Sequence, residues 1–259
     1  MSNDEHKQPE AGEVKESSTG ILITKNTRIG LLPGSLKFTQ SGNEFNLSIS
    51  LDLGLDMCSY WLQIAYEHLI SAELSHTNLK ESTDDDKLAF FLEREFLAGM
   101  QSIVASAITI DALHAAVKDR INISSKILET WNRNKLSRKK QIREVFRRGF
   151  SIDKSTEKQL WLMISDVIEL RDFAVHPTAK LRKPVFYPEI RRHVEWRFEH
   201  YRFQNAYLAT RSLLSAVIYF VTRAKEKYPI VQKYCSELSI SIEPLVNKWE
   251  AKYGSLYSS

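Results

Sequence analysis

This chain has few of the residues on which disulfide-bonded, zinc-binding or turn-rich proteins depend. Its 259 residues include only two cysteines, nine glycines and seven prolines. Cys58 and Cys235 lie far apart, and neither has a Cys or His neighbour at zinc-site spacing, so neither a disulfide framework nor a zinc site is expected. Scarce glycine and proline argue against a many-stranded β protein. Two free thiols fit a reducing cytoplasm, which is the predicted location.

Long uncharged apolar runs are also missing. The run 102–117 is interrupted by Asp111 and His114, and Leu213–Val221 is much shorter than the roughly 20 residues that cross a bilayer. Residues 1–20 carry five acids against two bases, so we expect a disordered tail and no secretory signal. A soluble chain with no membrane partner follows from this pattern.

The segment 21–55 has the pattern of strands. Residues 21–24 are β-prone, Pro33-Gly34 is a turn dipeptide, and apolar residues alternate with polar or small ones from Phe45 to Leu53. This is the period of a half-buried strand, so we predict a small accessory β-hairpin or meander. A hairpin alone is marginal in water, and it must therefore pack on the following residues or on another chain.

Residues 56–259 are predicted to form a mainly α bundle of four or more core helices. Apolar residues recur at intervals of three and four, with polar or proline-bearing breaks near 76–86, 120–135, 177–189 and 229. The break before the second helix supplies Ser82, Thr83 and Asp84–Asp86 as capping residues. The expected helices are Met57–Ala72, Lys87–Val117, Lys139–Phe150, Glu157–Phe173, Phe203–Lys227 and Ile230–Tyr253.

Two helices carry polar side chains at positions expected to face the core. Around Phe96–Val117 the sequence is apolar on nearly every side, so Asp111 there needs a cationic partner, and His114 lies one turn further on the same face. On the helix with the stripe Leu160, Ile164 and Val167, the next stripe position is Arg171. His176 precedes Pro177, which disfavours helix and predicts that the helix ends there.

The segment 170–177, which reads Leu-Arg-Asp-Phe-Ala-Val-His-Pro, resembles the R-x4-6-H signature of HEPN domains. Asp172 occupies the position where that signature carries a polar residue after the Arg. The upstream apolar helix with Asp111 resembles the acid-bearing HEPN helix, so the resemblance covers about residues 90–225. It implies a HEPN-like helical bundle, preceded here by the β-hairpin or meander.

The resemblance further implies a metal-independent RNA endonuclease that acts as a homodimer. In it, Arg171 and His176 would be catalytic, with Asp172 and Asp111 in support. These residue types suit cleavage by the ribose 2′-OH, because imidazole moves protons near neutral pH and a fixed guanidinium stabilises charge on phosphate. A toxin or antiviral-defence effector, held in check by an antitoxin or regulatory protein, is the expected role. We expect no metal or cofactor, since no P-loop, G-x-S-x-G or H-E-x-x-H motif occurs.

A structural interpretation of the same residues stays open. Arg171 would then pair with Asp111 as a buried salt bridge, and His176 would bond the helix end. In that case the chain would be a non-catalytic HEPN-like module that binds nucleic acid, a nucleotide or a protein partner. Asp111 and His114 taken alone are more often core polar residues than catalytic ones.

A basic segment between residues 131 and 149 is the candidate RNA-binding surface. It has eight cations and one acid, Glu144, which gives a local charge of 8 − 1 = +7. On a helix these cations form a strip that could bind RNA phosphates without sequence specificity. A solvated helix face explains the same cations equally well. The predicted RNA-binding residues are Arg138, Lys139, Lys140, Arg143, Arg147 and Arg148.

A second basic region mixes cations with aromatic residues. Phe186, Tyr187, Trp196, Phe198 and Tyr201 would either stack on unpaired bases or pack the last helices onto the bundle. The cations among them are Lys180, Arg182, Lys183, Arg191 and Arg192.

Overall fold

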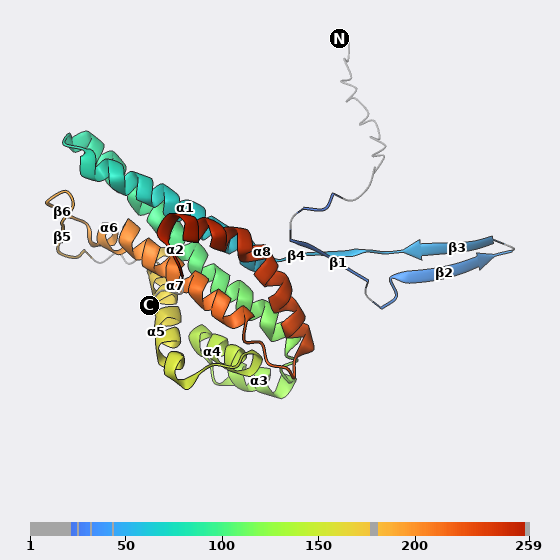
Figure 1. Cartoon of the computed structure of the whole chain (residues 1–259). Helices are drawn as coiled ribbons and strands as arrows, with labels where there is room; N and C mark the ends of the chain where they lie inside the picture. The colour runs from blue at the N-terminus through green and yellow to red at the C-terminus, as the bar shows by residue number, and fades with distance from the viewer. Residues whose placement is uncertain (1–21, 25, 32, 43, 177–180, 257–259) are drawn as a thin grey trace, which may run out of the picture. The chain divides into compact units, whose positions relative to one another are not determined.

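The computed structural model describes residues 22–24, 26–31, 33–42, 44–176 and 181–256. The predicted tail at 1–20 lies outside these residues. The chain divides into two compact units, one up to Leu55 and one from Asp56 onward. The chain is mainly helical, with short antiparallel strands near the N-terminus (Figure 1), as predicted.

The N-terminal unit is a pair of two-stranded antiparallel ribbons. The first pairs β1 (Thr27–Gly30) with β4 (Asp52–Leu55), and the second pairs β2 (Leu36–Ser41) with β3 (Glu44–Ile49). Pro33 and Gly34 form the predicted turn. The predicted hairpin is therefore confirmed.

Two details of the strand prediction are wrong. Residues 22–24 lie outside any strand, because Thr24 begins a turn. The amide and the hydroxyl of Thr24 both form hydrogen bonds with the Thr27 hydroxyl, at 3.2 and 3.0 Å. The alternating segment is also not half-buried, since every residue of β3 is exposed. Alternation predicted the strand correctly, but it did not indicate what would cover its apolar side.

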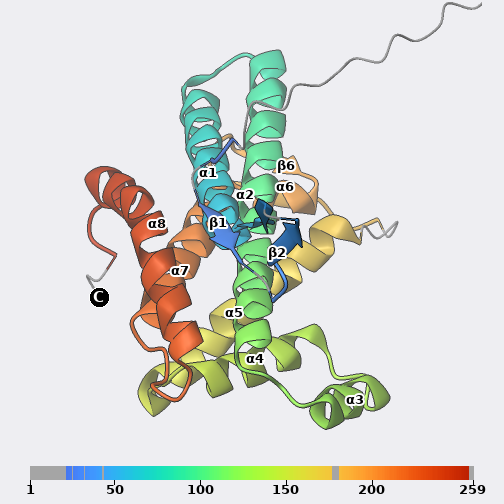
Figure 2. The same ribbon diagram turned by 90° about the vertical axis from the view of Figure 1, so that its right-hand side faces the viewer.

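Two long helices form the centre of the second unit. Helix α1 spans Met57–Glu81 and α2 spans Asp85–Arg120, and they pack side by side (Figures 1 and 2). The side chain of Asp84 accepts a hydrogen bond from the Lys87 amide at 3.0 Å, which confirms the predicted cap. The predicted break at 76–81 is wrong, because His76 and Leu79 are buried and extend the packed face of α1.

Helix α2 is the core helix of this unit, as predicted. It packs on α1, α5, α7 and α4, and it buries apolar residues on several sides. Among the described helices it alone is long and apolar enough to cross a membrane, and 56% of its most apolar 18-residue stretch is buried by protein. That burial fits the core helix of a soluble bundle.

The remaining helices surround α2. They are α3 (Ser125–Arg133), α4 (Arg138–Gly149), α5 (Lys154–Val175), α6 (Trp196–His200), α7 (Phe203–Val221) and α8 (Pro229–Tyr253). A short ribbon of β5 (Val185–Tyr187) and β6 (Arg192–Val194) precedes α6. The strands β5 and β6 and the helix α6 were not predicted.

Two further predictions about helix extent are wrong. The predicted break at 120–135 contains α3, which buries Trp131 against the core. Helix α7 ends at Val221 and not at Lys227, because the chain there pairs with the end of α4. The Ser151 amide bonds to the Arg223 carbonyl at 2.8 Å, and the Lys225 amide bonds to the Gly149 carbonyl at 2.9 Å. These bonds satisfy backbone groups that a longer helix would have used internally.

Candidate functional site

The C-terminal half of α5 positions the candidate catalytic residues. Leu160, Ile164 and Val167 are buried on its inner face, so the stripe that predicted this helix does pack into the core. Arg171 continues the stripe, and its side chain is only 23% exposed. A guanidinium in this position needs an anion, because desolvating an unpaired charge is costly.

Asp111 on α2 supplies that anion. Its Oδ2 lies 3.6 Å from Nη1 of Arg171, and its Oδ1 accepts a hydrogen bond from Nε of Arg138 on α4 at 2.7 Å. One carboxylate thus joins two guanidiniums from two helices. The predicted cation beside Asp111 is confirmed as Arg171, and Arg138 is a second cation there that was not predicted.

Asp172 adds a second carboxylate to Arg171. Its Oδ1 lies 3.0 Å from Nε of Arg171, at ion-pair distance but without the angle of a hydrogen bond. Arg171 therefore lies between two carboxylates, one on α2 and one on its own helix. This arrangement fixes the guanidinium, and it is compatible with either a structural salt bridge or a positioned catalytic cation.

His176 ends the helix, as the following proline predicted. Helix α5 stops at Val175, and His176 leaves the helical conformation with φ −120° and ψ 69°. Its backbone amide still bonds to the Asp172 carbonyl at 2.9 Å. The residue is exposed, and its imidazole makes no hydrogen bond or ion pair with any residue that the structure describes.

The four candidate catalytic residues therefore fall into two groups. Asp111, Arg171 and Asp172 form one ion-pair cluster, and the His176 ring stands apart from it at the helix end. On a continuous helix the two positions would be about 140° apart, but α5 stops at Val175, so His176 is not bound to that direction. Arg171 and His176 do not line any of the four described cavities.

The predicted RNA-binding strip on α4 is largely paired with acids. Lys139 lies 3.6 Å from Glu169, Arg143 and Arg147 each lie 3.2 Å from Glu157, and Arg148 pairs with Glu144 at 2.6 Å. Arg138 forms its ion pair with Asp111. Of the six predicted residues, only Lys140 therefore has no ion pair with a described residue.

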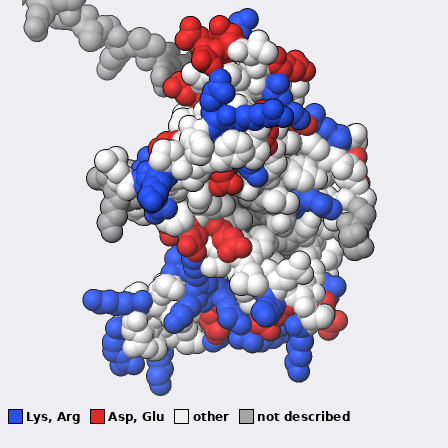
Figure 3. Space-filling view, turned by 90° about the vertical axis from the view of Figure 1, so that its left-hand side faces the viewer, with Lys and Arg blue, Asp and Glu red and all other residues white. Residues whose placement is uncertain are grey.

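These pairs lower the charge of the strip without covering it. Six cations against the carboxylates of Asp111, Glu144, Glu157 and Glu169 leave a balance of 6 − 4 = +2. The paired cations remain between 37 and 53% exposed, so their ion pairs are weak and salt-sensitive. Figure 3 shows Lys and Arg gathered at the α3–α4 end of the bundle, with acids next to them.

In the second basic region most of the aromatic residues pack onto the bundle, whereas the described cations Arg182, Lys183, Arg191 and Arg192 are exposed. Tyr187, Trp196 and Tyr201 are buried, and the guanidinium of Arg182 lies 4.1 Å from the centre of the Trp196 ring. Phe186 is 53% exposed and remains available for stacking. Lys180 lies outside the described residues.

His114 is buried in α2 and takes no part in the ion-pair cluster. Neither ring nitrogen has a hydrogen-bond partner among the described residues. Burial, reinforced by the nearby charges of Arg138 and Lys118, lowers the pKa of His114 to about 3. It is therefore a neutral core residue at physiological pH, as the structural interpretation expected.

A buried polar network surrounds Glu95 and was not predicted. This carboxylate on α2 is 1% exposed, and it lies 3.0 Å from Nδ1 of His76. It also accepts hydrogen bonds from the Tyr187 hydroxyl at 2.9 Å and from the Phe203 amide at 2.7 Å, the latter at the N-terminus of α7. Its partners lie 19 to 108 residues away in sequence, so no local pattern indicates them.

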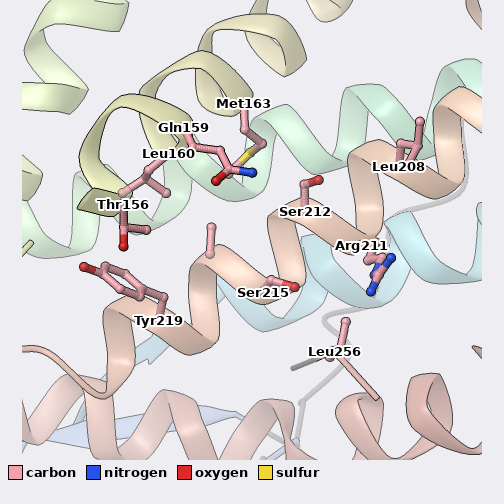
Figure 4. Close-up of a pocket in the computed structure, with 11 residues that line it drawn as sticks. Thr156, Gln159, Leu160, Met163, Leu208, Arg211, Ser212, Ser215, Tyr219 and Leu256 are labelled. Atoms are coloured by element: carbon pink, nitrogen blue, oxygen red, sulfur yellow. The ribbon is translucent and has the colours of Figure 1, made fainter. Parts of the chain in front are cut away.

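A cavity of about 350 Å³ between α5 and α7 was also missed (Figure 4). Apolar side chains such as Leu160, Met163 and Leu208 line it together with Ser212, Ser215 and Gln159. A second cavity, of about 380 Å³, shares Met163 and Leu208 and reaches Leu170. Together they form one groove along the two helices. Its lining comes from α5, α7 and Leu256 near the C-terminus, so the periodicity of one helix alone gives no signal for it.

No family model, curated protein or solved structure matches this chain. Among the described residues, no group of three or more His, Cys, Asp or Glu side chains is arranged to hold a metal ion. Both cysteines are free and buried, and burial raises the pKa of the Cys235 thiol to about 12.

Proposed function

We propose that this chain is a metal-independent RNA endonuclease of the HEPN type, acting as a homodimer in the cytoplasm. The observation that carries the proposal is the end of α5. There Asp111 and Asp172 hold a partly exposed Arg171 in place, and the helix stop leaves the His176 imidazole exposed to solvent.

The chemistry follows from these groups. The 2′-oxygen of a ribose attacks the adjacent phosphorus as its proton is removed, and the bond to the 5′-oxygen breaks as that oxygen takes up a proton. His176 moves protons in this reaction, and Arg171 stabilises the negative charge that grows on the phosphoryl oxygens. Asp111 and Asp172 are positioning residues, since they contact Arg171 and fix the direction of its guanidinium.

A second copy would complete the site. Within one chain, carboxylates fix Arg171, whereas the His176 imidazole has no ion pair or hydrogen bond with Arg171. Two helix ends brought together would let the guanidinium of one copy face the imidazole of the other. Cleavage of cellular RNA by such a dimer suits a toxin or antiviral-defence effector that an antitoxin or regulatory protein restrains.

The cations at the α3–α4 end would give affinity for RNA. Lys140 is exposed without an ion pair among the described residues, and the paired arginines beside it can exchange a weak carboxylate contact for a phosphate. Binding through them would weaken as salt rises and would discriminate little between sequences.

Arg171→Ala tests this function. The purified wild-type chain is incubated with mixed RNA in EDTA, beside Arg171→Ala and a control, Arg94→Ala, whose exposed guanidinium lies over Phe90 on another part of α2. We expect Arg171→Ala to lose roughly 100-fold or more of the cleavage rate, and Arg94→Ala to keep it. Cleavage by Arg171→Ala at the wild-type rate would refute the assignment.

A non-catalytic module that binds nucleic acid, a nucleotide or a protein partner is the second candidate. Two observations favour it. Both carboxylates beside Arg171 belong to its own chain, and the α5–α7 groove is a concave surface that neither Arg171 nor His176 lines. This candidate predicts no RNA turnover by the wild type, and Arg171→Ala would chiefly lower the melting temperature.

A further inference from the structure

The β2–β3 ribbon has one wholly uncharged face. Its register pairs Leu36 with Ile49, Phe38 with Leu47, and Gln40 with Phe45, and each pair projects to the same side of the ribbon. We call these six side chains the ribbon face. Five of them are apolar, and none carries a charge.

The opposite side of the ribbon is polar. The pairs between those of the ribbon face are Lys37 with Ser48 and Thr39 with Asn46. A shift of one residue in register would move every apolar side chain of one strand to this polar side. The sequence therefore defines an amphipathic ribbon of the kind that packs one side on a partner.

No described residue of the N-terminal unit covers this face. Phe38 is 77% exposed, Phe45 is 79% exposed, and Leu36, Leu47 and Ile49 are each about half exposed. A two-stranded ribbon with an uncovered apolar face is marginal in water, because three or more strands or a covering layer are needed for stability. Contiguous apolar surface of this kind marks an interaction site.

We propose that the ribbon face packs against the same face of a second copy of this chain. A face without charge has no like-charge repulsion to overcome when it meets itself. Two ribbons face to face also form a four-stranded layered unit, which supplies the missing apolar layer to both copies at once. The proposal does not depend on RNA cleavage, because it concerns the N-terminal unit alone.

Full burial of this face would reach the size of a small specific interface. From the exposed fractions, the five apolar side chains offer on the order of 600 Å² per copy, since a phenylalanine alone buries roughly 150–250 Å². Two copies would then bury on the order of 1,200 Å², which reaches the lower range of specific interfaces.

The test compares self-association of three full-length chains by sedimentation equilibrium over a range of concentrations. Phe38→Thr with Leu47→Thr removes apolar area but keeps residues that favour strands. Thr39→Ala with Asn46→Ala makes a matched double change on the polar side of the same two strands. We expect the first variant to associate roughly 10-fold or more weakly than the wild type, and the second to associate as the wild type does.

A second variant guards against loss of the ribbon itself. Phe38→Lys places a like charge on both copies of the ribbon face, so its association should also be weakened, and high salt should partly restore it. A wild type that stays monomeric at high concentration, or association unchanged in both ribbon-face variants, would overturn the proposal. So would a monomer that binds phosphatidylcholine vesicles through Phe38 and Leu47, since this would assign the ribbon face to a membrane.

RNA cleavage by the ribbon-face variants separates this proposal from the proposed function. Both variants keep Arg171 and His176 unchanged. If the ribbon proposal fails, the ribbon-face variants associate as the wild type does. If the proposed function fails, neither the wild type nor any variant cleaves RNA.

Discussion

The helical bundle and the β2–β3 ribbon share a periodic pattern of apolar residues but differ in how far those residues are buried. In both, apolar residues recur with the period of their secondary structure. In the bundle the apolar stripes meet one another, and Leu69, Ile103 and Leu113 are at most 1% exposed. In the ribbon the apolar side chains stay between about half and four-fifths exposed. The period indicates which side needs a cover, but it does not indicate which chain provides one.

The largest difference in stability is expected at Glu95. Glu95→Ala leaves His76 and Tyr187 buried without their carboxylate and removes an acceptor at the start of α7. We expect the free energy of unfolding to fall by about 3–5 kcal/mol in chemical denaturation. The matched change in the ribbon, Glu44→Ala, affects an exposed residue and should alter it by less than about 0.5 kcal/mol. Equal effects would contradict the assignment of Glu95 to a buried network.

The same substitution in both regions gives the next largest contrast. Leu69→Ala in α1 opens a cavity at a fully buried position and should cost about 2–5 kcal/mol. Leu47→Ala in β3 removes a half-exposed side chain and should leave the melting of the bundle nearly unchanged, while it weakens self-association. Thermal melts followed by helical circular dichroism measure the first effect. Similar losses in the two variants would show that the ribbon is covered within its own chain.

One buried histidine extends the comparison to titration. The pKa of His114 is lowered from 6.5 to about 3, so the unfolded chain takes up a proton between these pH values while the folded chain does not. The free energy of unfolding should therefore fall as the pH falls through this window, by about 1.4 kcal/mol per pH unit at most. His114→Leu should lose less stability than the wild type between pH 6.5 and 4.5. Parallel losses in the two chains would refute a buried, neutral His114.

The smallest effect is expected at the exposed ion pairs. Arg138 is 41% exposed and shares Asp111 with Arg171, so Arg138→Ala still leaves that carboxylate a partner. We expect a loss of at most about 1 kcal/mol in the free energy of unfolding, and it should shrink further at high salt. A larger, salt-independent loss would indicate that Asp111 depends chiefly on Arg138.

The features that sequence predicted are those set by near neighbours. Asp84 caps α2, the residue before Pro177 ends α5, and the stripe of α5 directs Arg171 inward. The need of Asp111 for a cation was also predictable, because an apolar helix surrounds it. Each of these follows from residues within one or two helical turns.

The features that sequence did not predict depend on distant residues. Three of the acids that pair with α4 lie on other helices, Asp111 on α2 and Glu157 and Glu169 on α5, so the pattern of α4 alone does not indicate them. Glu95 reads as a surface residue of an amphipathic helix until Tyr187 and Phe203 cover it. Helix α3 was missed because its polar sequence hides the single buried Trp131.

The most direct test of the central claim is the rate at which His176→Ala cleaves RNA in EDTA, relative to the wild type. His193→Ala is the matched control, because it removes another exposed histidine, on β6. With melting temperatures unchanged in both variants, we predict a rate roughly 100-fold or more below wild type for His176→Ala and a wild-type rate for His193→Ala. Equal rates for His176→Ala and the wild type would contradict a catalytic role for the end of α5.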